Sequence, residues 1–149
     1  MIDYIYLVIP FTSVAVAQII KFTIESVQEK KLKWLRLLNG NGGMPSTHTS
    51  FCFSLTAYIG MMYGINNPLF AMGLVFSLIV SYDAMGMRRE SEKQAVAINK
   101  IVDELDDDIP KIKMKKLKEQ IGHEPLEVFM GMILGTFMAL VFYYLVFPK

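Results

Sequence analysis

Two histidines are the residues of this sequence best suited to nucleophilic or acid–base chemistry. His123 stands four residues before Glu127, in the segment Gly122-His-Glu-Pro-Leu-Glu127. A carboxylate at that spacing can hold one ring nitrogen and orient the other as a nucleophile or base. The competing interpretation is structural: Pro125 opens a helix, and Glu127 then satisfies backbone amides in its first turn.

The other histidine, His48, lies in the segment Asn39-Gly-Asn-Gly-Gly-Met-Pro-Ser-Thr-His-Thr49. Gly43 lets the backbone approach a ligand closely, and Ser46 and Thr47 supply hydroxyl groups. A helix that begins here directs free amides and the positive end of its dipole at one point, which suits an oxyanion. An ordinary loop with a capped helix start explains the same residues, because serine and threonine are common caps.

The elements that must position these residues are membrane helices. The chain has 149 residues, of which 53% are hydrophobic and 19% charged. Its apolar residues fall in four blocks, at about 2–24, 47–63, 68–87 and 126–147. Each block approaches the roughly 20 apolar residues that a bilayer requires. We therefore predict one all-α membrane domain, 1–149, built as a bundle of about four transmembrane helices, with segments 25–46 and 88–125 outside the bilayer.

The distribution of positive charge predicts how this bundle is oriented. Lysines and arginines gather in segments 25–46 and 88–125, whereas residues 64–67, between the second and third blocks, carry no charge. Basic residues stay in the cytosol. We therefore predict that both long polar segments are cytosolic and that both termini lie on the outer side of the cell membrane. His48 and His123 then share one depth on one side. The net charge of +1 gives no indication of nucleic-acid binding.

The second polar segment contains an amphipathic pattern of its own. Ala95, Ile98, Val102 and Leu105 recur at helical spacing, with charged residues between them. This predicts a cytosolic helix that continues the third span, with its apolar stripe packed over the cytosolic face of the bundle. The run Asp106-Asp-Asp-Ile-Pro110 is expected to end it, because proline cannot continue the helical hydrogen bonds.

Charged residues at the ends of the apolar blocks could bind an anion. Arg88 and Arg89 close the third block and Lys21 closes the first. Arginine offers a planar fork for phosphate oxygens, although such residues commonly only extend to the membrane interface. Asp83 lies deeper in the third block and Gln18 in the first, and a charge inside a span is costly and therefore a functional candidate. Asp83 could pair with the lysine or an arginine, and a purely structural ion pair explains it as well.

The whole set of segments resembles a known family. The similarity is to the divergent branch of the type 2 phosphatidic acid phosphatase superfamily, also called acid phosphatase/vanadium-dependent haloperoxidase related, and it covers nearly the whole chain. The matching segments are Gly43-Met-Pro-Ser-Thr-His-Thr49, Tyr82-Asp-Ala-Met-Gly-Met-Arg-Arg89, Gln94-Ala95, Asn99 and Gly122-His-Glu-Pro-Leu-Glu-Val128. Thr47 stands where the wider superfamily has the glycine of its Pro-Ser-Gly-His element.

The resemblance implies a role for each candidate residue. It implies that His48 is the acid, that His123 attacks phosphorus and that Glu127 orients His123. The implied phosphate clamp consists of Arg88, Arg89 and Lys21. From the helix start we add Ser46, Thr47 and Gly43 as phosphate-binding candidates, and we expect Asp83, Gln18 and Gln94 to support the site. Neither a metal nor a cofactor is expected, because cations and helix ends can stabilise the equatorial oxygens of the phosphoryl group.

Three functions remain open at this stage. The first is a phosphatase or phosphotransferase that acts on an inner-leaflet lipid phosphate through a histidine nucleophile. The second is a non-catalytic protein that binds or transports anionic lipid headgroups. The third is a metal-dependent hydrolase with ligands His48, Asp83, His123 and Glu127, although their spacing is no recognised zinc signature. A chain this small is a candidate for a homodimer that encloses the substrate.

Overall fold

The computed structural model of the protein describes residues 4–30, 42–108, 116–117 and 122–146. Its helices are α1 (Ile5–Glu29), α2 (Thr47–Tyr63), α3 (Pro68–Met85), α4 (Met87–Asp108) and α5 (Pro125–Val146). No strand occurs within the described ranges. The predicted all-α membrane bundle is thus confirmed. Ile109 and Pro110, which are predicted to end the cytosolic helix, lie outside the described residues. Helix α4 ends directly before them, at Asp108.

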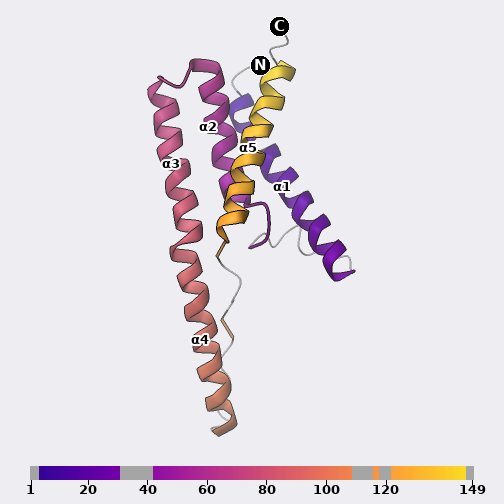
Figure 1. The fold of residues 1–149 in the computed structure, drawn as a ribbon, viewed down its shortest axis with the longest axis vertical. Coiled ribbons are helices and arrows are strands. Elements are labelled where there is room, and N and C mark those ends of the chain that lie inside the picture. The colour runs from indigo at the N-terminus through magenta and orange to yellow at the C-terminus, as the bar shows by residue number, and fades with distance from the viewer. Residues whose placement is uncertain (1–3, 31–41, 109–115, 118–121, 147–149) are drawn as a thin grey trace.

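Three of the helical segments are long and apolar enough to cross a bilayer. They are Ile5–Glu29, Pro68–Glu104 and Pro125–Leu145. Helix α2 has 17 residues, which is the lower limit of the usual spanning length of about 17–25 residues. It contacts α1, α3 and α5 and lies between α3 and α5 in Figure 1. The remaining predicted span, 47–63, therefore corresponds to the central helix α2. Its crossing of the membrane stays a prediction.

Helices α1, α2 and α3 run alternately down and up, α4 continues in the direction of α3, and α5 runs back, so that the connections gather at two ends. The start of α1, the turn between α2 and α3 and the end of α5 lie at one end (Figure 1). The starts of α2 and α5, the end of α1 and the whole of α4 lie toward the other, which we call the polar end. Both histidine segments are therefore brought to the polar end.

Small residues let the backbones of α2 and α5 approach each other closely. A Cβ atom added at Gly131 would lie 2.6 Å from the carbonyl oxygen of Ser46, and one added at Gly135 would lie 2.5 Å from that of Ser50. Buried hydroxyls connect the other helices: Ser13 of α1 hydrogen-bonds Ser50. In lipid, close backbone contact and such hydrogen bonds hold helices together where the hydrophobic effect cannot.

Helix α4 continues α3 through a single residue, as the sequence predicts. The amide of Gly86 donates to the carbonyl of Tyr82 at 2.8 Å, and the amide of Glu90 donates to the carbonyl of Gly86 at 3.0 Å. Helical hydrogen bonds thus persist across the junction, and α3 and α4 form one long rod that leaves the bundle (Figure 1).

The face of α4 that is buried differs from the expected apolar stripe. Ala95 is buried as predicted, but Ile98 is 44% exposed and the polar side chain of Asn99 is only 4% exposed. The reason is that α4 projects beyond the other helices, so no bundle surface lies beneath its apolar stripe. Its buried face instead meets the chain that returns toward α5.

Candidate functional site

The imidazole of His123 is held by Glu127. Nδ1 of His123 lies 2.7 Å from Oε2 of Glu127, and the two side chains are 3% and 19% exposed. The same oxygen accepts a hydrogen bond from the backbone amide of Glu124 at 3.2 Å. Glu127 therefore caps the start of α5 and also holds one ring nitrogen of the histidine. The role of the other nitrogen as a nucleophile or base stays a prediction.

This contact determines which ring nitrogen of His123 is available. A carboxylate can only accept a hydrogen bond, so Nδ1 carries the proton and Nε2 keeps its lone pair. Burial lowers the pKa of His123, and the positive charges of Lys21 and Arg88 lower it further, whereas the hydrogen bond that the ring donates to Glu127 raises it. A neutral imidazole with a free Nε2 is the form that can attack an electrophile.

The backbone around His123 is fixed as firmly as its ring. The amide of His123 donates to the carbonyl of Ala84, near the end of α3, at 3.1 Å. A Cβ atom added to Gly122 would lie 2.7 Å from the Cα atom of Arg89. Only glycine allows the chain to pass this close to α4, so the segment is locked against the α3–α4 junction.

The start of α2 joins the start of α5 through a main-chain bond. The amide of Ser46 donates to the carbonyl of Glu127 at 2.9 Å. Ser46 is also the N-cap of α2: its fully buried hydroxyl accepts from Oγ1 of Thr49 at 3.0 Å and from the amide of Thr49 at 3.4 Å. The predicted cap is confirmed, and phosphate binding by the Ser46 hydroxyl stays a prediction. Thr47, the first residue of α2, is 6% exposed.

His48 follows in the first turn of α2 and has an exposed side chain. It lies close enough to four charged or titratable groups for their charges to act on it: Arg88, His123, Lys21 and Asp83. The two histidines, 75 positions apart in sequence, therefore belong to one cluster. His48 lies on its open side and His123 on its closed side.

Lys21 ties the end of α1 to the glycine segment before α2. Its side chain is 1% exposed, and its Nζ donates to the carbonyl of Gly42 at 3.0 Å. Gly42 and Gly43 have φ angles of 73° and 80°, a left-handed conformation that glycine adopts without steric cost. The glycines thus shape the backbone that receives the lysine, and the buried ammonium adds a positive charge beside both histidines.

Arg88 is the partner of Asp83. Nε of Arg88 lies 2.9 Å from Oδ2 of Asp83, and the side chains are 41% and 39% exposed. This pair settles the choice that the sequence leaves open. Arg89, in contrast, has an exposed side chain, and it meets the site through its backbone at Gly122.

The two glutamines predicted to support the site lie at different places. Gln18 is half-buried, one turn before Lys21 on α1, and its Oε1 atom is buried with no hydrogen-bond partner among the described residues. Gln94 lies on α4 with an exposed side chain. Within the described residues, no three histidine, cysteine, aspartate or glutamate side chains form a group that could hold a metal ion.

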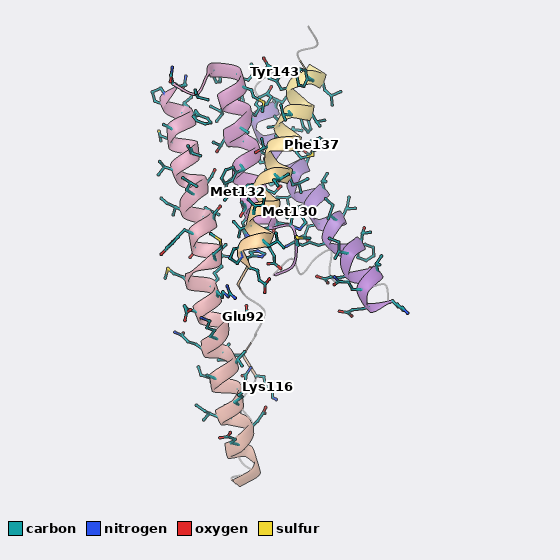
Figure 2. All side chains as sticks on the ribbon, viewed as in Figure 1. Glu92, Lys116, Met130, Met132, Phe137 and Tyr143 are labelled. Carbon is teal, nitrogen blue, oxygen red and sulfur yellow. The ribbon has the colours of Figure 1, made fainter. Side chains whose placement is uncertain are left out.

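Two residues of α4 contact the chain leading to His123, and sequence reasoning gave neither a role. Oε2 of Glu92 accepts a hydrogen bond from the amide of Gly122 at 3.0 Å. The carboxamide of Asn99 donates to the carbonyl of Leu117 at 2.9 Å and accepts from its amide at 2.8 Å. Figure 2 shows Lys116 of the returning chain beside α4, farther from the other helices than Glu92. Two signals were present in the sequence: Glu92, Ala95 and Asn99 share one helical face, and Asn99 is among the residues that carry the family resemblance.

Comparison with known proteins identifies the family. The family model described as "Divergent PAP2 family" matches residues 2–138. The chain belongs to the Divergent PAP2 family. The uncharacterized membrane protein YuiD of Bacillus subtilis (strain 168) is 38% identical over an alignment of 138 residues, and the alignment covers 86% of this chain and 87% of that relative. No solved structure matches the chain.

Membership of the Divergent PAP2 family confirms the resemblance inferred from the motifs. The matched range includes α1 to α4 and most of α5, so it contains both histidine segments and the α3–α4 junction. The Divergent PAP2 match thus applies to the whole cluster at the polar end.

Proposed function

We propose that the protein is a membrane phosphatase or phosphotransferase that acts on a lipid phosphate at the polar end of the bundle, with His123 as the nucleophile. The observation that carries this proposal is the contact between buried His123 and half-buried Glu127, whose Nδ1 and Oε2 atoms lie 2.7 Å apart. The pair leaves Nε2 unprotonated beside the charges of Lys21 and Arg88. Membership of a phosphatase-related family supports the same chemistry.

In the first step, Nε2 of His123 attacks phosphorus. The Nε2–P bond forms as the bond between phosphorus and the lipid oxygen breaks, and protonated His48 gives its proton to the departing oxygen. Glu127, which accepts from Nδ1, stabilises the positive charge that develops on the ring. Lys21, Arg88 and the amides at the start of α2 are positioned to stabilise the phosphoryl oxygens.

In the second step, water attacks the phosphohistidine. The P–O bond to water forms, the Nε2–P bond breaks, and neutral His48 takes the proton, which restores both histidines. An acceptor alcohol in place of water makes the same reaction a transfer. The position of the cluster at the end of apolar helices suits a lipid substrate, because the phosphate can reach the histidines while its chains stay in the bilayer. We place this end in the cytosol on the basis of the positive charges.

The test is phosphate release from a panel of lipid phosphates by the purified protein in detergent, with and without a chelator. We expect release by the wild type, loss of about 10³-fold or more in His123→Ala, and no effect of the chelator. Glu124→Ala is the matched control, because this neighbouring side chain is exposed. A phosphoenzyme that is stable in base and labile in acid is expected in the wild type alone.

The other outcomes distinguish the alternative functions. Release abolished by the chelator would overturn the metal-free mechanism in favour of a metal-dependent hydrolase. No release across the panel, together with headgroup binding that His123→Ala weakens, would replace catalysis by binding or transport of anionic lipids.

A further inference from the structure

We infer that Asn99 and Glu92 of α4 are positioning residues, which hold the chain that carries His123 and thereby place the nucleophile. This inference rests on the proposed function, because it assigns the two residues a task in the same reaction. Neither is proposed to touch the substrate. They act through the returning segment, by which we mean the chain between α4 and α5, of which residues 116–117 and 122–124 are described.

Asn99 makes the more unusual of the two contacts. Its carboxamide satisfies both backbone groups of Leu117, at 2.9 Å and 2.8 Å. Among side chains of this length, only asparagine offers a donor and an acceptor on one planar group, so the contact fixes both the position and the orientation of the Leu117 backbone. Asn99 is 4% exposed whereas Leu117 is 46% exposed. The hydrogen bonds, rather than burial of the leucine, therefore hold the segment here.

Glu92 makes the second contact directly before the nucleophile. Its carboxylate accepts from the amide of Gly122 at 3.0 Å, and His123 is the next residue. Glu92 and Asn99 lie seven positions apart, about 10 Å along the helix, on the same face as Ala95. Ala95, between them on that face, is small and 4% exposed.

The consequence is that the backbone of His123 is located from one side and its ring from the other. The α3–α4 rod supplies Glu92 and the carbonyl of Ala84, and α5 supplies Glu127. Loss of one contact to the rod would shift the histidine without removing any group that binds phosphate. Misplacement by about 1 Å can lower a rate 10²-fold, so the effect should fall on kcat and leave KM nearly unchanged.

The activity test compares four variants with the wild type. Asn99→Ala and Glu92→Ala are expected to lower kcat by about 10-fold or more. Glu92→Gln is expected to stay near the wild type, since its amide oxygen can accept the same hydrogen bond. The matched control is Lys116→Ala, which removes an ion pair with Asp103 between the same two segments (2.7 Å, with both side chains more than half exposed) and should change kcat less than twofold.

A second readout does not depend on activity. Ring-nitrogen NMR of 15N-histidine-labelled protein, assigned with His48→Gln, reports the tautomer and titration of His123. The groups that face its ring are Glu127 from α5, Lys21 from α1, Arg88 from α4 and His48 from α2. In Asn99→Ala and Glu92→Ala the ring should become more exposed, and its pKa should move up toward the ordinary 6.5; Glu92→Gln and Lys116→Ala should leave it unchanged.

The two readouts separate the inference from the proposed function. Shifts of the His123 resonances in a protein that releases no phosphate would uphold the positioning role and overturn the phosphatase. Wild-type kcat and wild-type His123 titration in Asn99→Ala and Glu92→Ala would overturn the positioning role. If Asn99→Ala does not fold, the comparison of Glu92→Ala with Glu92→Gln decides alone: equal behaviour of the two rejects the inference, and rescue by glutamine supports it.

Discussion

At the scale of single residues, Glu127 combines two tasks that the sequence offers as alternatives. One oxygen, Oε2, accepts hydrogen bonds from both Nδ1–H of His123 and the backbone amide of Glu124. The helix start and the orientation of the histidine therefore depend on the same atom. The cap fixes the rotamer of the carboxylate, and the carboxylate in turn fixes the ring of His123.

The protonation of His123 gives a prediction about pH. Burial lowers the pKa of His123 in the folded protein, and only the neutral ring can attack phosphorus. The acid limb of kcat/KM should therefore have its midpoint below 6.5, with activity lost as the pH falls through it. Stability should change in the same direction, because the unfolded chain binds this proton more readily than the folded protein. The neutral His123 ring therefore contributes its full stabilisation above pH 6.5, and this stabilisation is lost as the pH falls through the folded pKa.

The measurement is kcat/KM for phosphate release between about pH 4 and 8, with unfolding followed in the same buffers. An acid limb centred at 6.5 or above would contradict the prediction. His123→Ala provides the control for stability, because its unfolding should lose this part of the pH dependence.

At the scale of the helices, most of the architecture could be predicted from the sequence. Block 47–63 coincides with α2, and blocks 68–87 and 126–147 differ from α3 and α5 by at most two described residues, because polar caps and prolines mark those starts. Helix α1 reaches Glu29 rather than about residue 24. Hydropathy reports where a chain leaves the bilayer, whereas polar residues such as Glu25 can continue the helix beyond it.

The remaining differences come from contacts between segments that are distant in sequence. Apolar periodicity favours a buried Ile98 in α4, yet the structure buries Asn99, whose partner Leu117 belongs to a different segment. The pairing of Asp83 with Arg88 likewise depends on geometry at the Gly86 junction. In the site, the His123–Glu127 spacing was informative, whereas nothing in the pattern pointed to Glu92 as a partner of Gly122.

The contact between α2 and α5 gives a prediction at this scale. In Gly131→Ala the new methyl group would lie 2.6 Å from the carbonyl oxygen of Ser46, so the two helices must separate near both histidine segments. We expect a loss of about 1–3 kcal/mol of stability and a lower kcat. Ile133→Ala, at a 47% exposed position of the same helix, is the control. Thermal unfolding in detergent measures the effect, and equal Tm values for Gly131→Ala and the wild type would contradict it.

At the scale of the whole molecule, the alternation of the helices puts the starts of α1 and α3 at the end opposite the histidines (Figure 1). With α2 as a fourth span, the two termini share one side of the membrane and the candidate site faces the other. A homodimer remains a prediction of the sequence.

Cysteine labelling tests the orientation. With Cys52 replaced by alanine, Ile65→Cys in the exposed turn between α2 and α3 should react with a membrane-impermeant maleimide in intact cells, whereas Lys93→Cys on α4 should react only after the cells are opened. Both positions have exposed side chains in the folded protein, so the membrane alone should decide which one reacts. Denatured protein, in which both cysteines should react equally, is the control. The reverse pattern would put the site outside the cell and make an outer-leaflet lipid the substrate.

The rod formed by α3 and α4 also affects how the protein can be imaged. Helix α4 has 22 residues, or about 33 Å of helix, and Figure 1 shows it extending well past the other helices. A chain of 149 residues is otherwise hidden almost entirely within a detergent micelle, where electron cryomicroscopy finds little to align. A rigid projection that is continuous with a membrane helix is an alignment landmark, and an antibody fragment raised against its exposed face would turn the molecule into a particle whose orientation can be determined.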